Sequence, residues 1–428
     1  MTTDTPGPVR TDAQPAARGP SRIPRGYAPT LALANWGIYF AVVPPALIGL
    51  ALKVREIAGP GGQAEALALV TSVGAIVGLI GTPLIGRLSD RTVSRFGRRR
   101  PWLVGSSILC ALALMLVGSA GSIGVVLVGW CLAQVAGNAA ITALNATVAD
   151  QVPAEKRGFV SSLIAIGAPG ASLAGTGAVS LLADGMARFA VPGIVCAVLC
   201  CLFAFVLPDQ RLERSERPPF GFLSFAGSYA FNPRRHRDFA WVCLNRFLMF
   251  FGYFGIRGYT VYFLIERFNL SDSKVAGTFF VANLFSVVGM AVAGPLCGYL
   301  SDRFESRRPF VVIAGLTMVV GFVALASAPS MAVVYVAELV IGLGFGSYAS
   351  VDIALGLATL PNQKDAGKDL AVLAVLGSLP QSIAPAIAPA ILALGAALPM
   401  GGYATWFLFG ALVSLSGAFL VFRVKGVR

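Results

Sequence analysis

Four charged side chains lie inside long apolar stretches of this 428-residue chain. Arg246 and Arg257 fall in one stretch, and Glu338 and Asp352 fall in another. A charge near the centre of a membrane-spanning helix costs roughly 2.5–3.5 kcal/mol on insertion scales, and such residues usually belong to functional sites. Arginine and carboxylate side chains in a membrane can form an ion pair, hold a solute between them, or load and release a proton. These four residues are therefore the first candidates for chemistry.

The positions of the four charges along their stretches divide them into two pairs. Arg257 and Glu338 each lie about seven or eight residues from the predicted outer end, which at 1.5 Å per residue is a depth of roughly 10–12 Å. We expect them to face each other, as an ion pair or with substrate between them, although a purely structural pair would give the same pattern. Arg246 and Asp352 lie nearer the inner side and could form a second pair, for coupling or for an inner gate. The apolar stretches contain no histidine, so a proton carrier must be a carboxylate, and we assign proton coupling to Glu338 and Asp352.

The elements that must position these charges are membrane-spanning helices. The chain is 56% hydrophobic and only 12% charged, with a mean hydropathy of +0.76. Soluble proteins usually carry about twice that charged fraction. A hydrocarbon core of roughly 30 Å needs about 20 apolar residues per helix. The sequence therefore predicts an all-α membrane protein with twelve transmembrane helices, at 28–52, 65–86, 101–119, 122–149, 158–183, 188–207, 239–265, 275–297, 310–328, 331–357, 368–394 and 402–422.

A repeated segment divides the twelve predicted helices into two sets of six. The segment GRLSDRTVSRFGRRRP (86–101) follows the second helix, and GYLSDRFESRRP (298–309) follows the eighth. Two related six-helix halves explain the repetition, as in many secondary transporters. The predicted domains are a disordered cytoplasmic tail, an N-terminal bundle, a cytoplasmic central loop, a C-terminal bundle and a second cytoplasmic tail, at 1–26, 27–207, 208–238, 239–422 and 423–428.

The positive charges of the chain indicate its orientation in the membrane. The formal net charge is +13, but lysine and arginine fall mostly in alternate connections rather than on one continuous face, which argues against a nucleic-acid partner. The positive-inside rule then places both termini in the cytoplasm of a plasma or cell inner membrane. All seven cysteines lie within or beside apolar stretches, which excludes a disulfide framework. The single histidine, His236, has no companion for a metal site, and we expect no cofactor.

The doubled GxLSDR segment, in the second and eighth connections of a twelve-helix chain, resembles the major facilitator superfamily. Within it, SDRTVSRFGRRRPW is similar to the loop of sucrose and glycoside–cation symporters, and the sequence over 358–385 is similar to their bacterial relatives. The resemblance implies a monomer of two pseudo-symmetric six-helix bundles that carries a small-molecule solute across the bilayer by alternating access. The first helix lacks the carboxylates of sodium-coupled members, so we expect the coupling ion to be a proton.

The same resemblance implies that the repeated loops stabilise the outward-facing state, although they could be topology signals only. We expect the two glycines to allow close helix approach and the two aspartates to face the positive end of a neighbouring helix. The arginines can pair with carboxylates such as Asp150 when the inner gate is closed. The predicted gating residues are Gly86, Asp90, Arg91, Arg95, Arg99, Arg100, Asp150, Arg157, Gly298, Asp302, Arg303 and Asp369.

The resemblance also implies that helices one, four, seven and ten line a central cavity. Polar and aromatic residues recur on these helices at steps of three or four, which keeps them on one helical face. The first helix adds a predicted break at Pro44–Pro45. Aromatic rings that alternate with amides and hydroxyls suit a sugar or a polycyclic solute. The predicted substrate-binding residues are Asn35, Trp36, Tyr39, Trp130, Gln134, Asn138, Arg246, Tyr253, Arg257, Glu338 and Tyr348.

The sequence contains no motif of an enzyme or of an ATP-driven pump. It has no GxxxxGK[ST] loop and no HExxH segment. A channel would not explain the paired half-repeats, which leaves secondary active transport. An Asn/Gln-lined, Met-poor cavity favours proton-coupled symport of a sugar or glycoside-like solute. The alternative is a proton-antiport exporter of a drug or secondary metabolite, which the segment GAPGASLAG (167–175) and the Phe-rich helix at 239–265 would suit.

Overall fold

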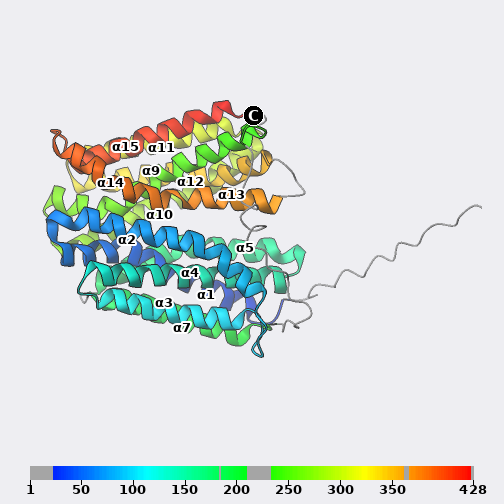
Figure 1. Cartoon of the computed structure of the whole chain (residues 1–428). Helices are drawn as coiled ribbons and strands as arrows, with labels where there is room; N and C mark the ends of the chain where they lie inside the picture. Colours follow the sequence, from blue (N-terminus) through cyan, green and yellow to red (C-terminus); the bar gives the residue numbers. More distant parts are fainter. Residues whose placement is uncertain (1–22, 183–184, 210–232, 361–365, 426–428) are drawn as a thin grey trace, which may run out of the picture.

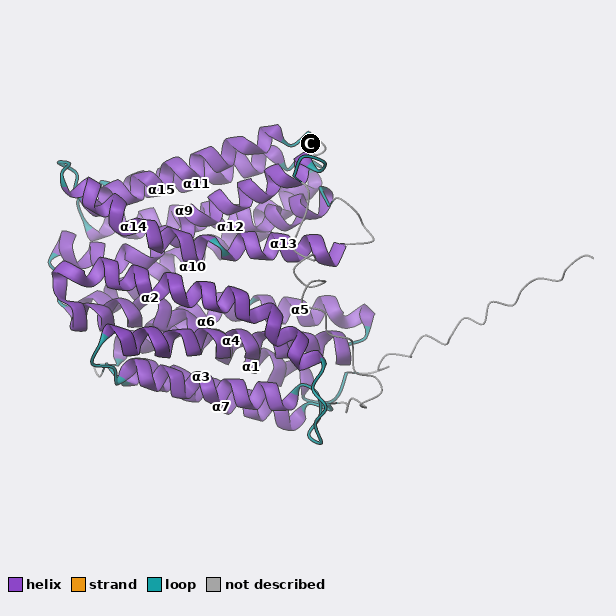
Figure 2. Cartoon of the chain, in the orientation of Figure 1, coloured by secondary structure: helices purple, strands orange, loops and turns teal. Residues whose placement is uncertain are grey.

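The computed structural model describes residues 23–182, 185–209, 233–360 and 366–425, and within these ranges the regular structure is entirely helical (Figure 2). The first half contains α1 Tyr27–Pro44, η1 Pro45–Gly49, α2 Leu50–Asp90, α3 Arg100–Gly118, α4 Ile123–Gln151, η2 Ala154–Lys156, α5 Arg157–Ala165, α6 Gly167–Leu181 and α7 Ala187–Val206. The second half contains α9 Arg237–Phe268, α10 Asp272–Arg303, α11 Arg308–Ala326, α12 Met331–Ala358, α13 Ala366–Ser378, α14 Pro380–Ala396, α15 Gly402–Leu420 and η5 Val421–Arg423.

Eleven helical segments in the described ranges are long and apolar enough to cross a membrane. The first of them, Tyr27–Asp90, has 64 residues, enough for two crossings. It is interrupted at Gly59, whose φ of 68° and ψ of 176° are not helical, directly before Pro60. The positive φ suits glycine because it has no Cβ. With this segment taken as two spans, the predicted all-α fold of about twelve transmembrane helices is confirmed.

The helices gather into two bundles, α1–α7 in one and α9–α15 in the other (Figure 1). Where the bundles meet, α2 packs against α14 and α6 packs against α10. The repeated loops, between α2 and α3 and between α10 and α11, lie at one end of the molecule, called here the motif end (Figure 1). The connection between α9 and α10 lies at the other end, called the opposite end. The predicted N-terminal tail, 1–26, and the predicted central loop, 208–238, fall largely outside the described residues, as does half of the predicted C-terminal tail, 423–428.

Prolines have different effects at different places in the helices. Pro101 and Pro309 stand in the first turns of α3 and α11, where a missing N–H costs no helical hydrogen bond. At the predicted break, Pro44–Pro45, α1 ends and the chain continues helically through the five-residue π-helix η1. A wider π turn is a known local adjustment inside α-helices. Spans five and eleven are interrupted, at Ile166 between α5 and α6 and at Leu379 between α13 and α14.

Glycines set the closest helix contact, between α10 and α12. A Cβ at Gly289 would meet the backbone of α12, and one at Gly342 would meet the backbone at Ser286. The predicted close approach at Gly86 and Gly298 is wrong: a Cβ there would meet Thr142 at 3.4 Å or Ser350 at 3.6 Å, which is ordinary van der Waals contact. The tight seam therefore lies deep in the second bundle, where it fixes α10 against α12, rather than in the repeated loops.

Candidate solute cavity

A cavity of about 750 Å³ lies between the two bundles. The four predicted helices all contribute to its wall, as α1, α4, α9 and α12, and α2, α6, α10, α13 and α14 contribute as well. Towards the motif end the wall reaches Gly86 of α2 and Ala371 of α13. The polar or charged wall residues are Tyr39, Thr82, Gln134, Asn138, Thr142, Ser172, Tyr253, Arg257, Asn283, Ser378 and Gln381.

The wall formed by the first bundle is neutral and able to form hydrogen bonds. Gln134, Asn138 and Thr142 lie one helical turn apart on α4, and Tyr39 faces the cavity from α1. The amide nitrogen of Asn138 donates to the Gln134 carbonyl at 2.8 Å, and the Thr142 hydroxyl donates to the Asn138 carbonyl at 2.7 Å. These bonds hold both side chains in place and leave the side-chain carbonyl of Asn138 as an acceptor. The first bundle therefore presents fixed amide and hydroxyl groups.

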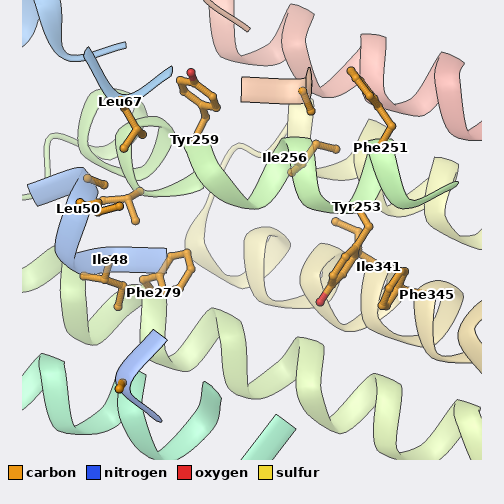
Figure 3. Close-up of a cluster of buried hydrophobic side chains, with 14 of the residues drawn as sticks. Ile48, Leu50, Leu67, Phe251, Tyr253, Ile256, Tyr259, Phe279, Ile341 and Phe345 are labelled. Carbon is orange, nitrogen blue, oxygen red and sulfur yellow. The ribbon is translucent and has the colours of Figure 1, made fainter. Parts of the chain in front are cut away.

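The wall formed by the second bundle combines aromatic rings with one charge. Tyr253 stacks on Phe345 with ring centroids 3.7 Å apart and planes 6° apart (Figure 3). Phe254 lies beside both rings. The guanidinium of Arg257, one turn along α9, lies 5.4 Å from the centre of the Tyr253 ring. A flat aromatic face beside a cation suits a ring-shaped solute that also has polar groups.

Arg257 and Glu338 face each other, with Arg257 Nη1 3.4 Å from Glu338 Oε2. The same Nη1 donates to the Ser286 hydroxyl at 3.2 Å, and Nη2 donates to the side-chain oxygen of Asn283. Arg257 lines the cavity, whereas Glu338 is only 3% exposed and lies behind the wall. The cavity therefore meets the positive member of the pair and not the negative one.

Asn283 is a site residue that the sequence analysis missed. Besides accepting from Arg257, its amide nitrogen donates to Thr176 Oγ1 at 3.2 Å and lies 3.3 Å from Ser172 Oγ, both on α6 of the other bundle. A signal for it was present, because Asn283 is the one amide side chain in the apolar stretch 275–297. One amide thus joins the charged pair to the contact between the bundles.

The second predicted pair forms away from the cavity wall. Arg246 Nη1 lies 2.5 Å from Asp352 Oδ2, and the guanidinium lies 5.0 Å from the centre of the Phe250 ring. The Tyr348 hydroxyl lies 2.9 Å from Asp352 Oδ1 and 2.8 Å from the side-chain oxygen of Asn245. The amide nitrogen of Asn245 donates to the carbonyl of Gly417, which leaves its oxygen towards Tyr348. One hydroxyl proton therefore serves two acceptors, and a proton on Asp352 would satisfy both.

Several predicted substrate-binding residues do not lie on the cavity wall. Asn35 donates to the Ile164 carbonyl at 3.0 Å, and Trp36 stacks on Phe40 with ring centroids 4.7 Å apart. Trp130 is buried against Gly74 of α2. Tyr39, Gln134, Asn138, Tyr253 and Arg257 do line the cavity, whereas Asn35, Trp36, Trp130, Arg246, Glu338 and Tyr348 do not.

The predicted gating residues of the first loop form a network inside one bundle. Arg99 bridges Asp90 at 2.7 Å and Asp150 at 3.1 Å, and Arg98 bridges Asp150 at 2.7 Å. The carboxylate of Asp209, another residue that the sequence analysis missed, accepts from the backbone N–H groups of Arg99 and Arg100, at the start of α3. Asp90 thus pairs with Arg99, the residue directly before α3. It therefore lies close to the positive end of α3, as the sequence analysis expected. The cavity reaches Gly86 at this end, so the bundles are apart there, and yet the ion pairs of Arg98 and Arg99 are formed. These ion pairs therefore do not depend on contact between the bundles.

The other predicted gating residues have varied surroundings. The side chain of Arg100 donates to the Leu207 carbonyl, and that of Arg157 donates to the carbonyls of Val152 and Ala149. Arg95 lies over the ring of Phe96, Arg91 is half-buried, and Asp302 and Arg303 are exposed. Asp369 is buried, and one of its carboxylate oxygens has no hydrogen-bond partner within the described part of the chain. The second repeated loop is therefore not a structural copy of the first.

The cavity is closed towards the opposite end by an apolar plug, defined as Ile48, Leu50, Leu67, Tyr259 and Phe279 (Figure 3). The first three come from the first bundle and the last two from the second. A hydrogen bond strengthens the closure, since the Tyr262 hydroxyl donates to the Ala51 carbonyl at 2.9 Å. The Tyr259 hydroxyl lies 3.3 Å from the Ala64 carbonyl of the first bundle and 3.2 Å from the Pro385 carbonyl of its own bundle. Near the surface, the ion pair Arg55–Asp272 (3.5 Å) joins the two bundles.

Two helical bundles with a closed plug at one end, and between them a cavity lined by both apolar and polar side chains, define a multi-span membrane transporter. The model of the Major Facilitator Superfamily matches residues 28–385. The chain therefore belongs to the Major Facilitator Superfamily, whose members are membrane transporters and not enzymes.

Solved transporter structures share this fold across nearly the whole chain. A nucleoside transporter, NupG, superposes with a TM-score of 0.73 at 12% identity, over 93% of this chain and 99% of that one. A D-xylose-proton symporter superposes with a TM-score of 0.69 at 15% identity, over 94% and 98%. A bacterial homolog of the human lysosomal transporter Spinster, in an inward-facing and unoccupied conformation, gives 0.69 at 14% identity, over 94% and 96%. At these identities the likeness concerns the fold alone.

Curated relatives match only short segments of this chain. Sucrose transport protein SUC4 of Arabidopsis thaliana is 31% identical over 90 residues, which are 21% of this chain and 16% of that protein. Sucrose transport protein SUT1 of Oryza sativa subsp. japonica is 39% identical over 51 residues, 12% and 10% of the two chains. Solute carrier family 45 member 3 of Mus musculus is 36% identical over 61 residues, 14% and 11%. The matches thus span no more than about a sixth of these relatives' lengths.

Proposed function

We propose that the protein is a proton-coupled symporter of a sugar or glycoside-like solute. The observation that carries the proposal is the composition of the cavity wall, with the amides of Gln134 and Asn138 on one side and a stacked Tyr253–Phe345 pair on the other. Amides and hydroxyls match the hydroxyl groups of a sugar, and aromatic faces pack against its apolar ring face. The segmental similarity to sucrose transport proteins supports the same solute class.

We assign the motif end to the cytoplasm of the plasma membrane, in accord with the positive-inside rule. With that orientation the described conformation is inward-facing, because the cavity extends towards the motif end and the apolar plug closes the other. The outward-facing state then requires the bundles to rock about the midplane, so that the plug separates and the helices around Gly86 and Ala371 approach each other. We regard the monomer as the working unit.

Protons are proposed to couple through the two buried carboxylates. Arg257 both pairs with Glu338 and lines the cavity. A change in the charge of Glu338 would therefore alter the electrostatic potential at the position of the solute. Asp352 accepts from Tyr348 and pairs with Arg246, so a change of its charge would rearrange this network. The apolar stretches offer no histidine for this role.

The second candidate is proton-antiport export of a drug or secondary metabolite. The observation that favours it is the apolar part of the wall, formed by Val42, Val43, Leu47, Val287 and Met290. A bulky amphipathic compound could cover these side chains, whereas a small sugar would leave several uncovered.

A thermal-stability screen of the purified protein separates the two candidates. Sugars and glycosides form one panel, and amphipathic antibiotics form the other. A ligand at about one hundred times its Kd stabilises the folded protein by about 2.7 kcal/mol. We expect a glycoside to stabilise the wild type and to lose this effect in Gln134→Ala and Asn138→Ala. Stabilisation by apolar compounds alone would overturn the symporter and favour the exporter.

A further inference from the structure

Arg257 is the one charged side chain among the described residues that line the cavity. No carboxylate and no lysine reaches the same wall in that part of the chain. A solute therefore meets a single positive charge among neutral amides, hydroxyls and aromatic rings. A neutral solute would use Arg257 only as a hydrogen-bond donor, an anionic solute would also gain from its charge, and a cationic solute would be repelled by it.

The hydrogen bonding of Arg257 leaves room for a further anionic partner. A guanidinium has five N–H donors. The bonds to Glu338, Ser286 and Asn283 engage three of them. Glu338 is held by one N–O contact of 3.4 Å rather than by the two parallel bonds that arginine and carboxylate form when well aligned. A second carboxylate that approaches from the cavity can thus compete for the same cation.

We propose that the solute carries a carboxylate, which binds Arg257 in exchange for Glu338 while Glu338 takes up the coupled proton. This inference rests on the proposed symport function and narrows its solute class to acidic sugars or acidic glycosides. The charges balance: the site gains one anion from the solute and one proton on Glu338, and its net charge is unchanged. Arg257 keeps one carboxylate partner before and after the exchange, so no buried guanidinium is left uncompensated.

The surroundings of Glu338 contain few groups that could perform this exchange in place of Arg257. From α9 the ionisable side chains that face it are Arg257 and Tyr253. The helix α10 has no ionisable side chain between Lys274 and Cys297, and presents Ser286 and Asn283 instead.

The remaining neighbours of Glu338 contribute even less. The only ionisable residue of α11 is Arg308, at its motif end. On α12 itself these residues are Tyr335, Tyr348 and Asp352, and on α13 they are Lys368 and Asp369. A proton on Glu338 therefore changes the charge next to Arg257 directly.

The test compares solutes that differ only in the acidic group. Suitable pairs are glucose with glucuronate, galactose with galacturonate, and 4-nitrophenyl glucoside with 4-nitrophenyl glucuronide. A fourth pair, an amphipathic carboxylic acid and its methyl ester, covers the exporter. Binding to the full-length protein in detergent is measured between pH 5 and 8. We expect the acid to bind about 10- to 100-fold more tightly than its neutral partner at low pH, the range of a charge-assisted hydrogen bond.

The pH dependence identifies Glu338 as the proton acceptor. The acid-bound site holds one proton more than the free site, so its affinity should rise by up to tenfold for each unit by which the pH falls. Glu338→Gln should bind the acid with no such slope. The matched control is Glu155→Gln, an exposed carboxylate in η2, which should keep the slope. Because Arg257→Gln alone strands a buried carboxylate, the double variant Arg257→Gln/Glu338→Gln serves as the second test and should lose the preference for acids.

The outcomes separate this inference from the proposed function. A sugar pair in which the neutral member binds as tightly as the acid would overturn the inference and leave sugar transport standing. An acid preference confined to the amphipathic pair would support the anion site and sink the sugar assignment. A pH slope that persists in Glu338→Gln would overturn the role of Glu338, and failure of every pair to bind would count against both proposals.

Discussion

Removing the charge of one member of the Arg246–Asp352 pair should strongly lower the free energy of unfolding. Asp352 is 2% exposed and Arg246 is 16% exposed, and their nearest N–O distance is 2.5 Å. Asp352→Asn keeps the size of the side chain but removes its charge. The guanidinium then lacks its counter-ion, and its Nε already has no partner in the described ranges. Removing one member of a buried ion pair costs about 3–5 kcal/mol, and we expect the lower part of this range because Arg246 is partly exposed.

The assay is the free energy of unfolding in detergent, with a matched pair at the surface as the control. Asp272→Asn removes the charge that faces Arg55, where the carboxylate is 61% exposed and the distance is 3.5 Å. Exposed pairs contribute about 0–1 kcal/mol. Replacing both members of the buried pair, Arg246→Met with Asp352→Leu, should recover most of the loss, because the cost lies in the unpaired charge. Equal losses for Asp352→Asn and Asp272→Asn would refute the reasoning.

Three further changes test the packing, the helix capping and the closure at the opposite end. Gly342→Val should lower the free energy of unfolding by about 1–3 kcal/mol or prevent folding, because the valine side chain would meet the backbone of α10. The yield of folded protein in size-exclusion chromatography should then fall. The control Gly277→Ala, which has open space around it, should leave that yield nearly unchanged. Asp209→Ala removes the acceptor of two backbone N–H groups at the start of α3 and should lower the free energy of unfolding by about 1 kcal/mol, with no loss if the cap is dispensable. Tyr262→Phe removes the hydrogen bond to the Ala51 carbonyl, which joins the two bundles. The distribution of distances between spin labels placed on the two bundles at the opposite end should then broaden towards longer values. An unchanged distribution would show that this hydrogen bond does not help to keep the opposite end closed.

The facing of Arg257 and Glu338 could be predicted because depth in a membrane helix follows from residue number. Each helix rises 1.5 Å per residue and its apolar stretch begins near the interface, so two charges at equal counts from the same surface lie at equal depth. Their attraction then brings them together whatever the details of packing. The observed N–O distance of 3.4 Å agrees with that reasoning.

The neighbours of a helical face could not be predicted in the same way. Trp130 and Gln134 lie one turn apart on α4, and their spacing correctly places them on one face. Trp130 nevertheless fills the space left by Gly74 of α2, whereas Gln134 reaches the cavity. Two crossing helices touch at one level and diverge at the next, so the level of contact decides between burial and exposure. That level depends on where the partner helix has its glycines, which no periodicity within α4 records.

The two bundles make unequal contributions to the site, and this inequality constrains how the transporter can work. The charge at the cavity and its counter-ion both come from the second bundle, so rocking of the bundles moves Arg257 and Glu338 together. Asn283 moves with them but also bonds to Thr176 of the first bundle. If the bundles rock as proposed, opening of the opposite end breaks that bond and returns the Asn283 amide to water or to solute. In the proposed cycle, solute binding at Arg257 and closure between the bundles would therefore act on the same side chain, Asn283.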